Sequence, residues 1–328
     1  MTWKEAFFRS PGPDSLREAG MLSLKGLCMG TADIIPGVSG GTIALITGIY
    51  QQLLMAIKSA DMAAFRRLMA GDVKGALAGL HLRFLLSLFL GIGVAIVSLA
   101  RLMNYLLVHQ PVFVWSLFMG LVVASIFVVA AKVPRWRTDT VCSLAAGTAM
   151  AWFIVNRVPV STPESWSFIF FSGMVAICAM ILPGISGAFI LLILGKYAFI
   201  TGTLKNPFIP YNMMVIAVFG AGCIVGLMGF SRLLNHLLDT RYNTTIAFLT
   251  GLMAGSLPKL WPWQVVVESR LIRGKMHVIS TANVIPDGWS GEVAAAILLF
   301  FLGTVAVLAL ERVSRSSTPS TGDPGKTT

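Results

Sequence analysis

Charged residues are scarce in this sequence. Asp, Glu, Lys and Arg make up 12% of its 328 residues, whereas hydrophobic residues make up 56%. A soluble domain carries about 25% charged residues, so this chain has too little polar surface to face water. Its mean hydropathy is +0.80, and several apolar runs reach the roughly 20 residues that cross a bilayer. The composition therefore excludes a soluble protein and predicts an all-α polytopic membrane protein.

Patterns for metal binding and disulfides are also missing. The four cysteines lie in apolar runs and the four histidines are scattered, so no CxxC or Cys/His spacing occurs. We expect no metal, no disulfide and no cofactor. The formal charge of +11 is better explained by orientation in a membrane and by anionic headgroups than by nucleic acid.

An internal repeat organises the chain. The segment from Ala32 to Tyr50, ADIIPGVSGGTIALITGIY, aligns without gaps to the segment from Ala179 to Tyr197, AMILPGISGAFILLILGKY, at an offset of 147 residues. Eleven of the nineteen positions match, including a Pro-Gly-x-Ser-Gly break. A second block repeats at an offset of 131, as RLMNYLL from Arg101 and RLLNHLL from Arg232. The alignment predicts two halves, repeat 1 over 19–158 and repeat 2 over 163–312.

Each half is predicted to hold one re-entrant helical hairpin and three transmembrane helices. The hairpins cover 19–60 and 166–203 and are interrupted at the Pro-Gly breaks, because proline removes a helix hydrogen bond and glycine lets the chain turn. A kinked but continuous span stays open as the alternative. Gly48 and Gly195, eight residues beyond the breaks' second glycines, are interpreted as helix-packing glycines. The other spans are predicted at about 82–107, 112–131, 141–158, 212–238, 244–261 and 292–310.

Parity predicts that the two repeats are inverted. A hairpin returns to its own side and three spans cross an odd number of times, so the second half begins on the opposite face. The predicted topology puts sixteen Lys and Arg residues on the side of both termini and seven on the other side, which places both termini in the cytoplasm. Residues 1–18 are predicted as an interfacial segment, with a disordered arm as the alternative, and residues 313–328 as a disordered tail.

The two breaks are the predicted binding site. Successive backbone N–H groups near glycines hold anions, hydroxyl groups add donors, and transporters aim broken helices at their substrates. The predicted substrate-binding residues are Pro36, Gly37, Ser39, Gly40, Gly41 and Thr42 in the first break and Pro183, Gly184, Ser186 and Gly187 in the second. The first break receives more weight, because Asp33, Gly41 and Thr42 become Met180, Ala188 and Phe189 in the second.

Charged residues inside apolar runs are further candidates. Asp33 is a candidate for proton coupling, since intramembrane carboxylates are costly and often functional; a helix cap or a partner for a basic residue is the alternative. Arg101 and Arg232 occupy equivalent repeat positions and suit a phosphate, with snorkelling to headgroups as their alternative. Lys25, Arg83 and Lys196 are weaker candidates of the same kind.

With these motifs, the chain resembles the PopT family of bacterial undecaprenyl-phosphate translocases. The string ADIIPGVSGGTIALITGIYQQLL and its second copy, ILPGISGAFILLILGKY, carry the resemblance, which extends from about Lys25 to Arg312. It implies an inner-membrane transporter, not an enzyme, that returns undecaprenyl phosphate from the periplasmic to the cytoplasmic leaflet for envelope synthesis. Its partners would be this lipid and the surrounding membrane lipids; a homo-oligomer stays open. The loop 264–290 has no counterpart in the first half.

Two other functions are weighed against this one. A membrane undecaprenyl-pyrophosphate phosphatase has a PGxSRS-type motif whose arginine holds the phosphate, but Gly40 and Gly187 follow the serines here. Without that arginine or a clustered acid site, phosphoryl transfer lacks electrostatic stabilisation. A carrier for a small soluble anion or ion needs the same charges as a lipid carrier, and a groove open sideways to lipid would separate the two.

Overall fold

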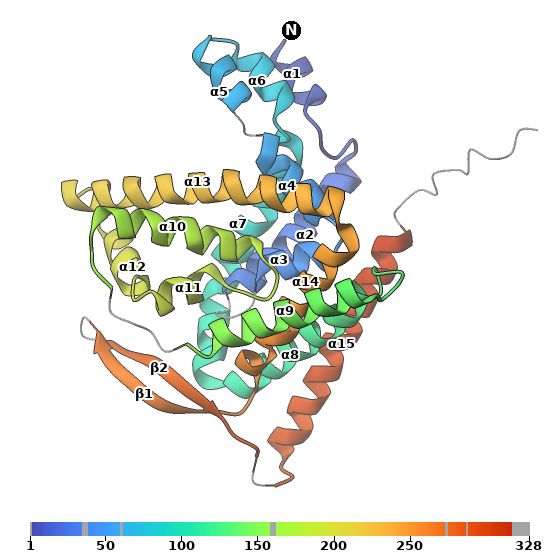
Figure 1. The fold of residues 1–328 in the computed structure, drawn as a ribbon, viewed down its shortest axis with the longest axis vertical. Helices are drawn as coiled ribbons and strands as arrows, with labels where there is room; N and C mark the ends of the chain where they lie inside the picture. Colours follow the sequence, from blue (N-terminus) through green and yellow to red (C-terminus); the bar gives the residue numbers. More distant parts are fainter. Residues whose placement is uncertain are drawn as a thin grey trace, which may run out of the picture.

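The computed structural model describes residues 2–34, 39–59, 62–157, 162–272, 275–286 and 288–316 (Figure 1). Within these ranges the chain is helical apart from one two-stranded sheet, which confirms the predicted all-α class. Pro36 and Gly37 of the first break lie outside the described residues, as do 317–328 of the predicted tail.

The two halves follow the same order of elements. The first half contains α1 (Trp3–Arg9), α2 (Leu16–Ile34), α3 (Gly40–Ile46), α4 (Tyr50–Ser59), α5 (Met62–Met69), α6 (Val73–Gly79), α7 (Leu82–His109), α8 (Pro111–Ala130) and α9 (Thr138–Val155). The second half contains α10 (Trp166–Ile181), α11 (Gly187–Ile193), α12 (Tyr197–Lys205), α13 (Pro210–Thr240), α14 (Tyr242–Ser256), the 3-10 helix η1 (Leu257–Leu260), β1 (Gln264–Ile272), β2 (Lys275–Asn283) and α15 (Gly291–Ser316).

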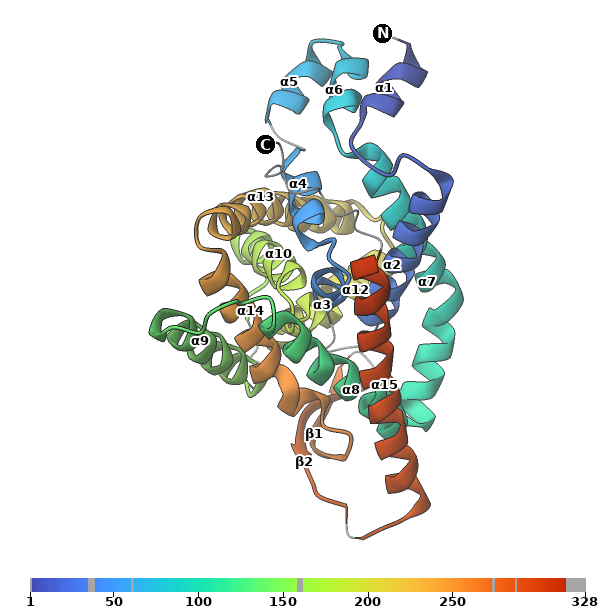
Figure 2. The same ribbon diagram turned by 90° about the vertical axis from the view of Figure 1, so that its right-hand side faces the viewer.

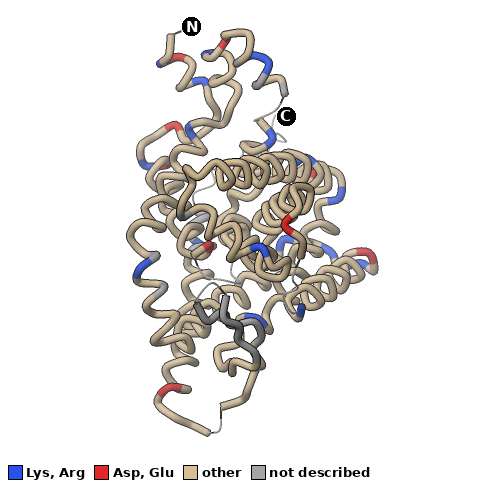
Figure 3. The backbone as a smooth tube through the Cα atoms, turned by 90° about the vertical axis from the view of Figure 1, so that its left-hand side faces the viewer, with Lys and Arg blue, Asp and Glu red and all other residues tan. Residues whose placement is uncertain are grey.

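The predicted spans are present as helices. In the described part of the chain, α7, α8, α9, α13 and α15 are long and apolar enough to cross a membrane, and Figure 3 shows long stretches of backbone without a charged residue. The span predicted at 244–261 is shorter, because α14 ends at Ser256 and η1, which contains Pro258, continues it. Helix α15 runs on to Ser316, into the segment predicted as a tail.

Both hairpins contain a second bend that the sequence interpretation missed. Helices α3 and α4 meet at an angle of 116°, and α11 and α12 at 115°. The bends lie at Gly48, with a φ of 76°, and at Gly195, with a φ of 63°. Glycine adopts this left-handed conformation without steric cost. The interpretation of both residues as packing glycines is therefore wrong, because they turn the chain.

The long helices pack in matching pairs. Helix α2 packs on α7 as α10 packs on α13, and α8 packs on α15 as α9 packs on α14. Glycines at equivalent repeat positions allow the close approach, because a Cβ there would collide with a carbonyl oxygen of the facing helix. The equivalent contacts, written as glycine and facing residue, are Gly91–Ser23 with Gly222–Phe170, Gly26–Leu88 with Gly173–Phe219, Gly120–Phe300 with Gly251–Leu144, and Gly147–Phe248 with Gly303–Leu117.

Two insertions distinguish the halves. Helices α5 and α6 occur only in the first half, which explains why the repeat offset falls from 147 to 131 after them. Strands β1 and β2, in the loop that had no counterpart, form an antiparallel pair in the second half. The group α1, α5 and α6 lies at one end of the molecule and the strands at the other (Figure 1, Figure 2). Helix α15 starts at the end with the strands and runs toward the end with α1.

The N-terminal segment is attached to the start of α7. Ser10 Oγ donates a hydrogen bond to the carbonyl oxygen of Leu80 at 2.6 Å, and Arg83 Nε donates to that of Ser10 at 2.7 Å. Arg83 also pairs with Asp14 at 3.1 Å. These contacts order the segment, while its position at the membrane surface stays a prediction.

Candidate functional site

The two breaks meet near the middle of the molecule, where α3 lies against α10 (Figure 2). Ser39 is the N-cap of α3, and its hydroxyl oxygen accepts a hydrogen bond from the Gly41 N–H at 3.1 Å. The Ser39 hydroxyl also donates toward two carbonyl oxygens at the end of α10, that of Leu182 at 3.1 Å and that of Met180 at 3.3 Å. Ser39 therefore joins the start of α3 to the end of α10.

Two further side chains of the first hairpin bind the main chain of the second. Thr42 Oγ1 accepts a hydrogen bond from the Gly184 N–H at 3.0 Å, and the Tyr50 hydroxyl donates to the carbonyl oxygen of Ile181 at 3.1 Å. Both side chains are buried. A membrane interior offers no water to replace these bonds. The first hairpin thus satisfies backbone groups that the second break leaves without helical partners.

Asp33, the candidate for proton coupling, binds the first turn of α3. Its Oδ1 accepts a hydrogen bond from the Gly40 N–H at 2.6 Å. A Cβ at Gly40 would lie 2.5 Å from Asp33 Oδ2, so glycine is what lets the carboxylate approach. This is the helix-cap arrangement that the sequence left open as an alternative, and proton coupling stays a prediction.

The other described glycines of the breaks lie where two backbones come close. A Cβ at Gly41 would lie 2.5 Å from the carbonyl oxygen of Ile181, and one at Gly187 would lie 2.5 Å from that of Ala176. Gly184 has a φ of 87°, a conformation that favours glycine. Gly41 lies inside α3 with an ordinary helical φ, so the close approach to α10 explains why glycine is needed there.

The second break contributes fewer polar side chains. Ser186 is the N-cap of α11, but its hydroxyl group makes no capping hydrogen bond. Ser186 and Pro183 are buried, whereas Ala188, the counterpart of Gly41, is exposed. The second break therefore contributes mainly main-chain groups to the hydrogen bonds of the junction.

The two candidate arginines form no hydrogen bond with this junction among the described residues. Arg101 is exposed on α7, and Arg232 donates to the carbonyl oxygen of Met228, one turn earlier in its own helix, at 3.1 Å. Within the described residues, neither arginine contacts the breaks.

Lysines hold the opposite end of α3. Lys25 Nζ donates to the carbonyl oxygen of Thr47 at 2.9 Å, and Lys132 Nζ donates to that of Leu45 at 3.1 Å. Lysine side chains commonly satisfy the last carbonyl groups of a helix. The sequence interpretation counted Lys25 only as a weak candidate, and it counted Lys132 among the sixteen Lys and Arg residues on the side of both termini. Nothing in the sequence pairs Lys132 with a carbonyl group 87 positions away.

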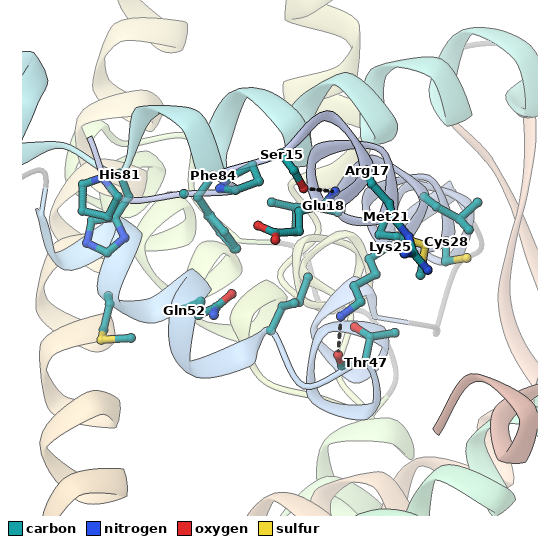
Figure 4. Close-up of a pocket in the computed structure, with 17 residues that line it drawn as sticks. Ser15, Arg17, Glu18, Met21, Lys25, Cys28, Thr47, Gln52, His81 and Phe84 are labelled. Atoms are coloured by element: carbon teal, nitrogen blue, oxygen red, sulfur yellow. Dashed lines mark hydrogen bonds between the residues drawn. The ribbon is translucent and has the colours of Figure 1, made fainter. Parts of the chain in front are cut away.

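A cavity of about 1050 Å³ lies between α2, α4 and the start of α7 (Figure 4). Its lining mixes charged, polar and apolar side chains. They are Arg17, Glu18, Met21, Leu22, Leu24, Lys25 and Cys28 from α2, Thr47, Ile49, Gln52 and Met55 from the turn after α3 and from α4, His81 and Phe84 from the start of α7, and Pro11, Gly12, Pro13 and Ser15 from the segment before α2. Burial lowers the pKa of the His81 imidazole below its ordinary value of 6.5, which keeps this group neutral at pH 7.

Fold and site together define a polytopic helical membrane protein whose two broken hairpins join through buried hydrogen bonds. The chain belongs to the undecaprenyl phosphate translocase-like family, whose profile matches residues 29–277. It is 37% identical to a Vibrio cholerae protein named polyprenyl-phosphate transporter, over 88% of this chain and 95% of the relative. It is 32% identical to a Staphylococcus aureus protein of the same name, over 73% of this chain and 85% of the relative. No solved structure matches.

These relatives confirm the family that the repeated motif indicated. Both are named as transporters and neither as an enzyme, which favours transport over the phosphatase alternative.

Proposed function

We propose that this protein carries undecaprenyl phosphate from the periplasmic to the cytoplasmic leaflet of the bacterial inner membrane, and that the phosphate is held at the two breaks. Family membership and the names of the relatives support a polyprenyl phosphate as the substrate. The observation that carries the choice of site is the buried junction, where Ser39, Thr42 and Tyr50 bind the main chain of the second hairpin. Buried backbone breaks of this kind mark substrate sites in transporters.

The junction as described is closed, so transport requires it to open. Its donors already have protein acceptors: Gly40 N–H binds Asp33, Gly41 N–H binds Ser39, and Gly184 N–H binds Thr42. The Gly40 and Gly41 N–H groups keep these partners when α3 and the end of α10 part, because Asp33 and Ser39 belong to the first hairpin. The Gly184 N–H loses Thr42, and the Ser39 and Tyr50 hydroxyl groups lose their carbonyl acceptors. A phosphate can then accept from them, and its binding favours the open state by the difference in its affinity for the two states.

We propose further that the halves are inverted repeats with both termini in the cytoplasm. The matching helix pairs and their equivalent glycines support a two-fold relation between the halves. The positions of α1 and of the strands at opposite ends support opposite sides of the membrane for these elements (Figure 1). Repeats related in this way can exchange conformations, which would expose the junction to each side in turn.

The cavity supports a lipid rather than a small soluble anion as the substrate. Three of its apolar lining side chains are exposed, Met21 at 37%, Leu24 at 51% and Met55 at 42%. A hydrocarbon tail gains from contact with such side chains, whereas a soluble anion does not. Arg101 and Arg232 remain in the proposal as residues that the phosphate meets when it approaches from either side, and Asp33 remains as the proton-coupling group.

Reconstitution in liposomes tests this function. Undecaprenyl phosphate placed in one leaflet should appear in the other at a rate that depends on the protein, and cells lacking every redundant carrier should expose more of this lipid outside. Unchanged exposure in those cells would count against the substrate. Hydrolysis of undecaprenyl pyrophosphate by the purified protein would instead revive the phosphatase.

A further inference from the structure

The cavity beside α2 is lined by two positively charged side chains, those of Arg17 and Lys25. The hydrogen bonds of the junction, by contrast, involve no Lys or Arg side chain. Arg17, Met21, Lys25 and Cys28 line the cavity from one face of α2, at spacings of four, four and three residues that place side chains above one another on a helix. Arg17 is exposed and Lys25 is half-buried. Arg17 and Lys25 are about 12 Å apart along the helix axis at 1.5 Å per residue. The two cations therefore mark a path from the surface to the interior.

Lys25 is the cation at the inner end of this path. Figure 4 shows its ammonium group bound to the carbonyl oxygen of Thr47 at 2.9 Å. An ammonium group has three N–H donors, and among the described residues no second acceptor binds this one. Two donors are therefore available to a ligand in the cavity. Lys132 holds the same end of α3 independently, so that end keeps a partner when Lys25 turns to a ligand.

The charge of the lining favours an anion. Arg17 and Lys25 carry positive charges, Glu18 carries a negative charge, and His81 is neutral at pH 7 because burial lowers its pKa. Glu18 Oε2 accepts a hydrogen bond from the Asp14 N–H at 2.9 Å, which directs the carboxylate toward the N-terminal segment. The lining therefore carries a net charge of +1, and Lys25 is the positive group at its inner end.

From these observations we infer that this cavity is a second binding site, a holding site for the phosphate of a polyprenyl phosphate lipid on the α1 side of the protein, with Lys25 as its main phosphate ligand and Arg17 at its mouth. This inference rests on the proposed function and adds a position distinct from the junction. The volume of about 1050 Å³ slightly exceeds the roughly 300–1000 Å³ of small-molecule sites, so it has room for the phosphate and the first isoprene units. Met21 and Met55 are flexible side chains that adapt to such a chain.

The holding site and the junction lie at opposite ends of α3. Thr47 is the C-cap of α3, and Ser39 is its N-cap. The seven residues between them span about 10 Å. A phosphate released from the junction on this side therefore travels about the length of α3 to reach Lys25.

Lys25→Gln tests the site, with Lys132→Gln as its matched control. Glutamine can still donate to the carbonyl group at the end of α3 but has no charge. Binding of undecaprenyl phosphate to the full-length protein in nanodiscs should weaken about ten- to hundredfold in Lys25→Gln, as expected for the loss of a charged hydrogen-bond partner. It should stay within about twofold in Lys132→Gln, and Lys25→Arg should restore it. Equal losses in both glutamine variants, or normal binding by Lys25→Gln, would overturn the inference.

A second measurement uses the unmodified protein, so it does not depend on how the variants fold. Cys28 lines the cavity and Cys142 is exposed outside it. Undecaprenyl phosphate should slow alkylation of Cys28, followed by mass spectrometry, and leave Cys142 unchanged. Equal protection of Cys28 by inorganic phosphate would show a site for free phosphate and overturn the lipid assignment, and no protection by the lipid would overturn the site. If transport in liposomes proceeds while Cys28 is unprotected, only this inference fails; if the protein neither binds nor transports the lipid, the proposed function fails.

Discussion

Replacing Gly41 with valine tests whether the junction between the breaks carries transport. A Cβ at this position would lie 2.5 Å from the carbonyl oxygen of Ile181 and 3.2 Å from Ser39 Oγ. The first of these atoms belongs to the main chain of α10, so it has to retreat by about 1 Å to reach ordinary contact. Added methyl groups in a packed interior cost roughly 1–3 kcal/mol, and valine adds three carbon atoms. We therefore expect the substitution to force α3 and α10 apart.

Thermal unfolding in detergent measures the effect of Gly41→Val on stability, and transport in liposomes measures its effect on function. Gly41→Val should lower the unfolding temperature. If the closed junction loses about 1–3 kcal/mol of stability, its equilibrium population relative to the open junction changes roughly five- to hundredfold. Transport should fall as well, because the valine side chain blocks the approach of the phosphate headgroup to the main chain at Gly41. Ala188→Val is the matched control, because Ala188 is the repeat counterpart of Gly41, already has a Cβ and is exposed. Equal stability and equal transport in the two variants would show that the phosphate does not pass through the junction.

Other changes test the same proposal. Ser39→Ala removes a donor to an ionised group and should lower affinity for undecaprenyl phosphate roughly ten- to hundredfold; binding within twofold of the unmodified protein would contradict its role. Asp33→Asn keeps an acceptor for the Gly40 N–H but cannot titrate, so transport should continue and lose its dependence on pH; an unchanged pH profile in liposomes would exclude Asp33 as the coupling group. A cysteine placed at Arg67 or Arg135 should resist an impermeant thiol reagent added to the periplasmic side, and its labelling there would reverse the proposed orientation.

The sequence predicts the spans and the breaks because both depend on local signals. Hydropathy over about 20 residues locates α7, α8, α9, α13 and α15. A proline followed by glycine inside an apolar run interrupts the helix there. The bends at Gly48 and Gly195 were missed because a glycine in an apolar helix packs closely in some proteins and turns the chain in others. Only the backbone conformation, with a φ of 76° at Gly48, decides between these roles.

The partners within the site could not be predicted, because they depend on contacts between distant segments. Ser39 binds Leu182, 143 positions away, and Thr42 binds Gly184, 142 positions away. The motif shows that Ser39 and Thr42 are polar but not that they bind the second hairpin. Lys25 shows the same limit, since its place in a cavity depends on how α2, α4 and α7 pack.

The difference between the two breaks follows from the way they meet. Two segments that pack against each other at one junction cannot both place a side chain in the same gap, so one supplies side chains and the other supplies main chain. Thr42 of the first break accepts from the Gly184 N–H of the second, and the residue at the matching position, Phe189, has no hydroxyl group to return the contact. The polar residues missing from the second copy therefore need not mean a weaker role in binding. When the junction opens, the second break offers the Gly184 N–H that Thr42 releases, and a phosphate held there would touch both hairpins at once.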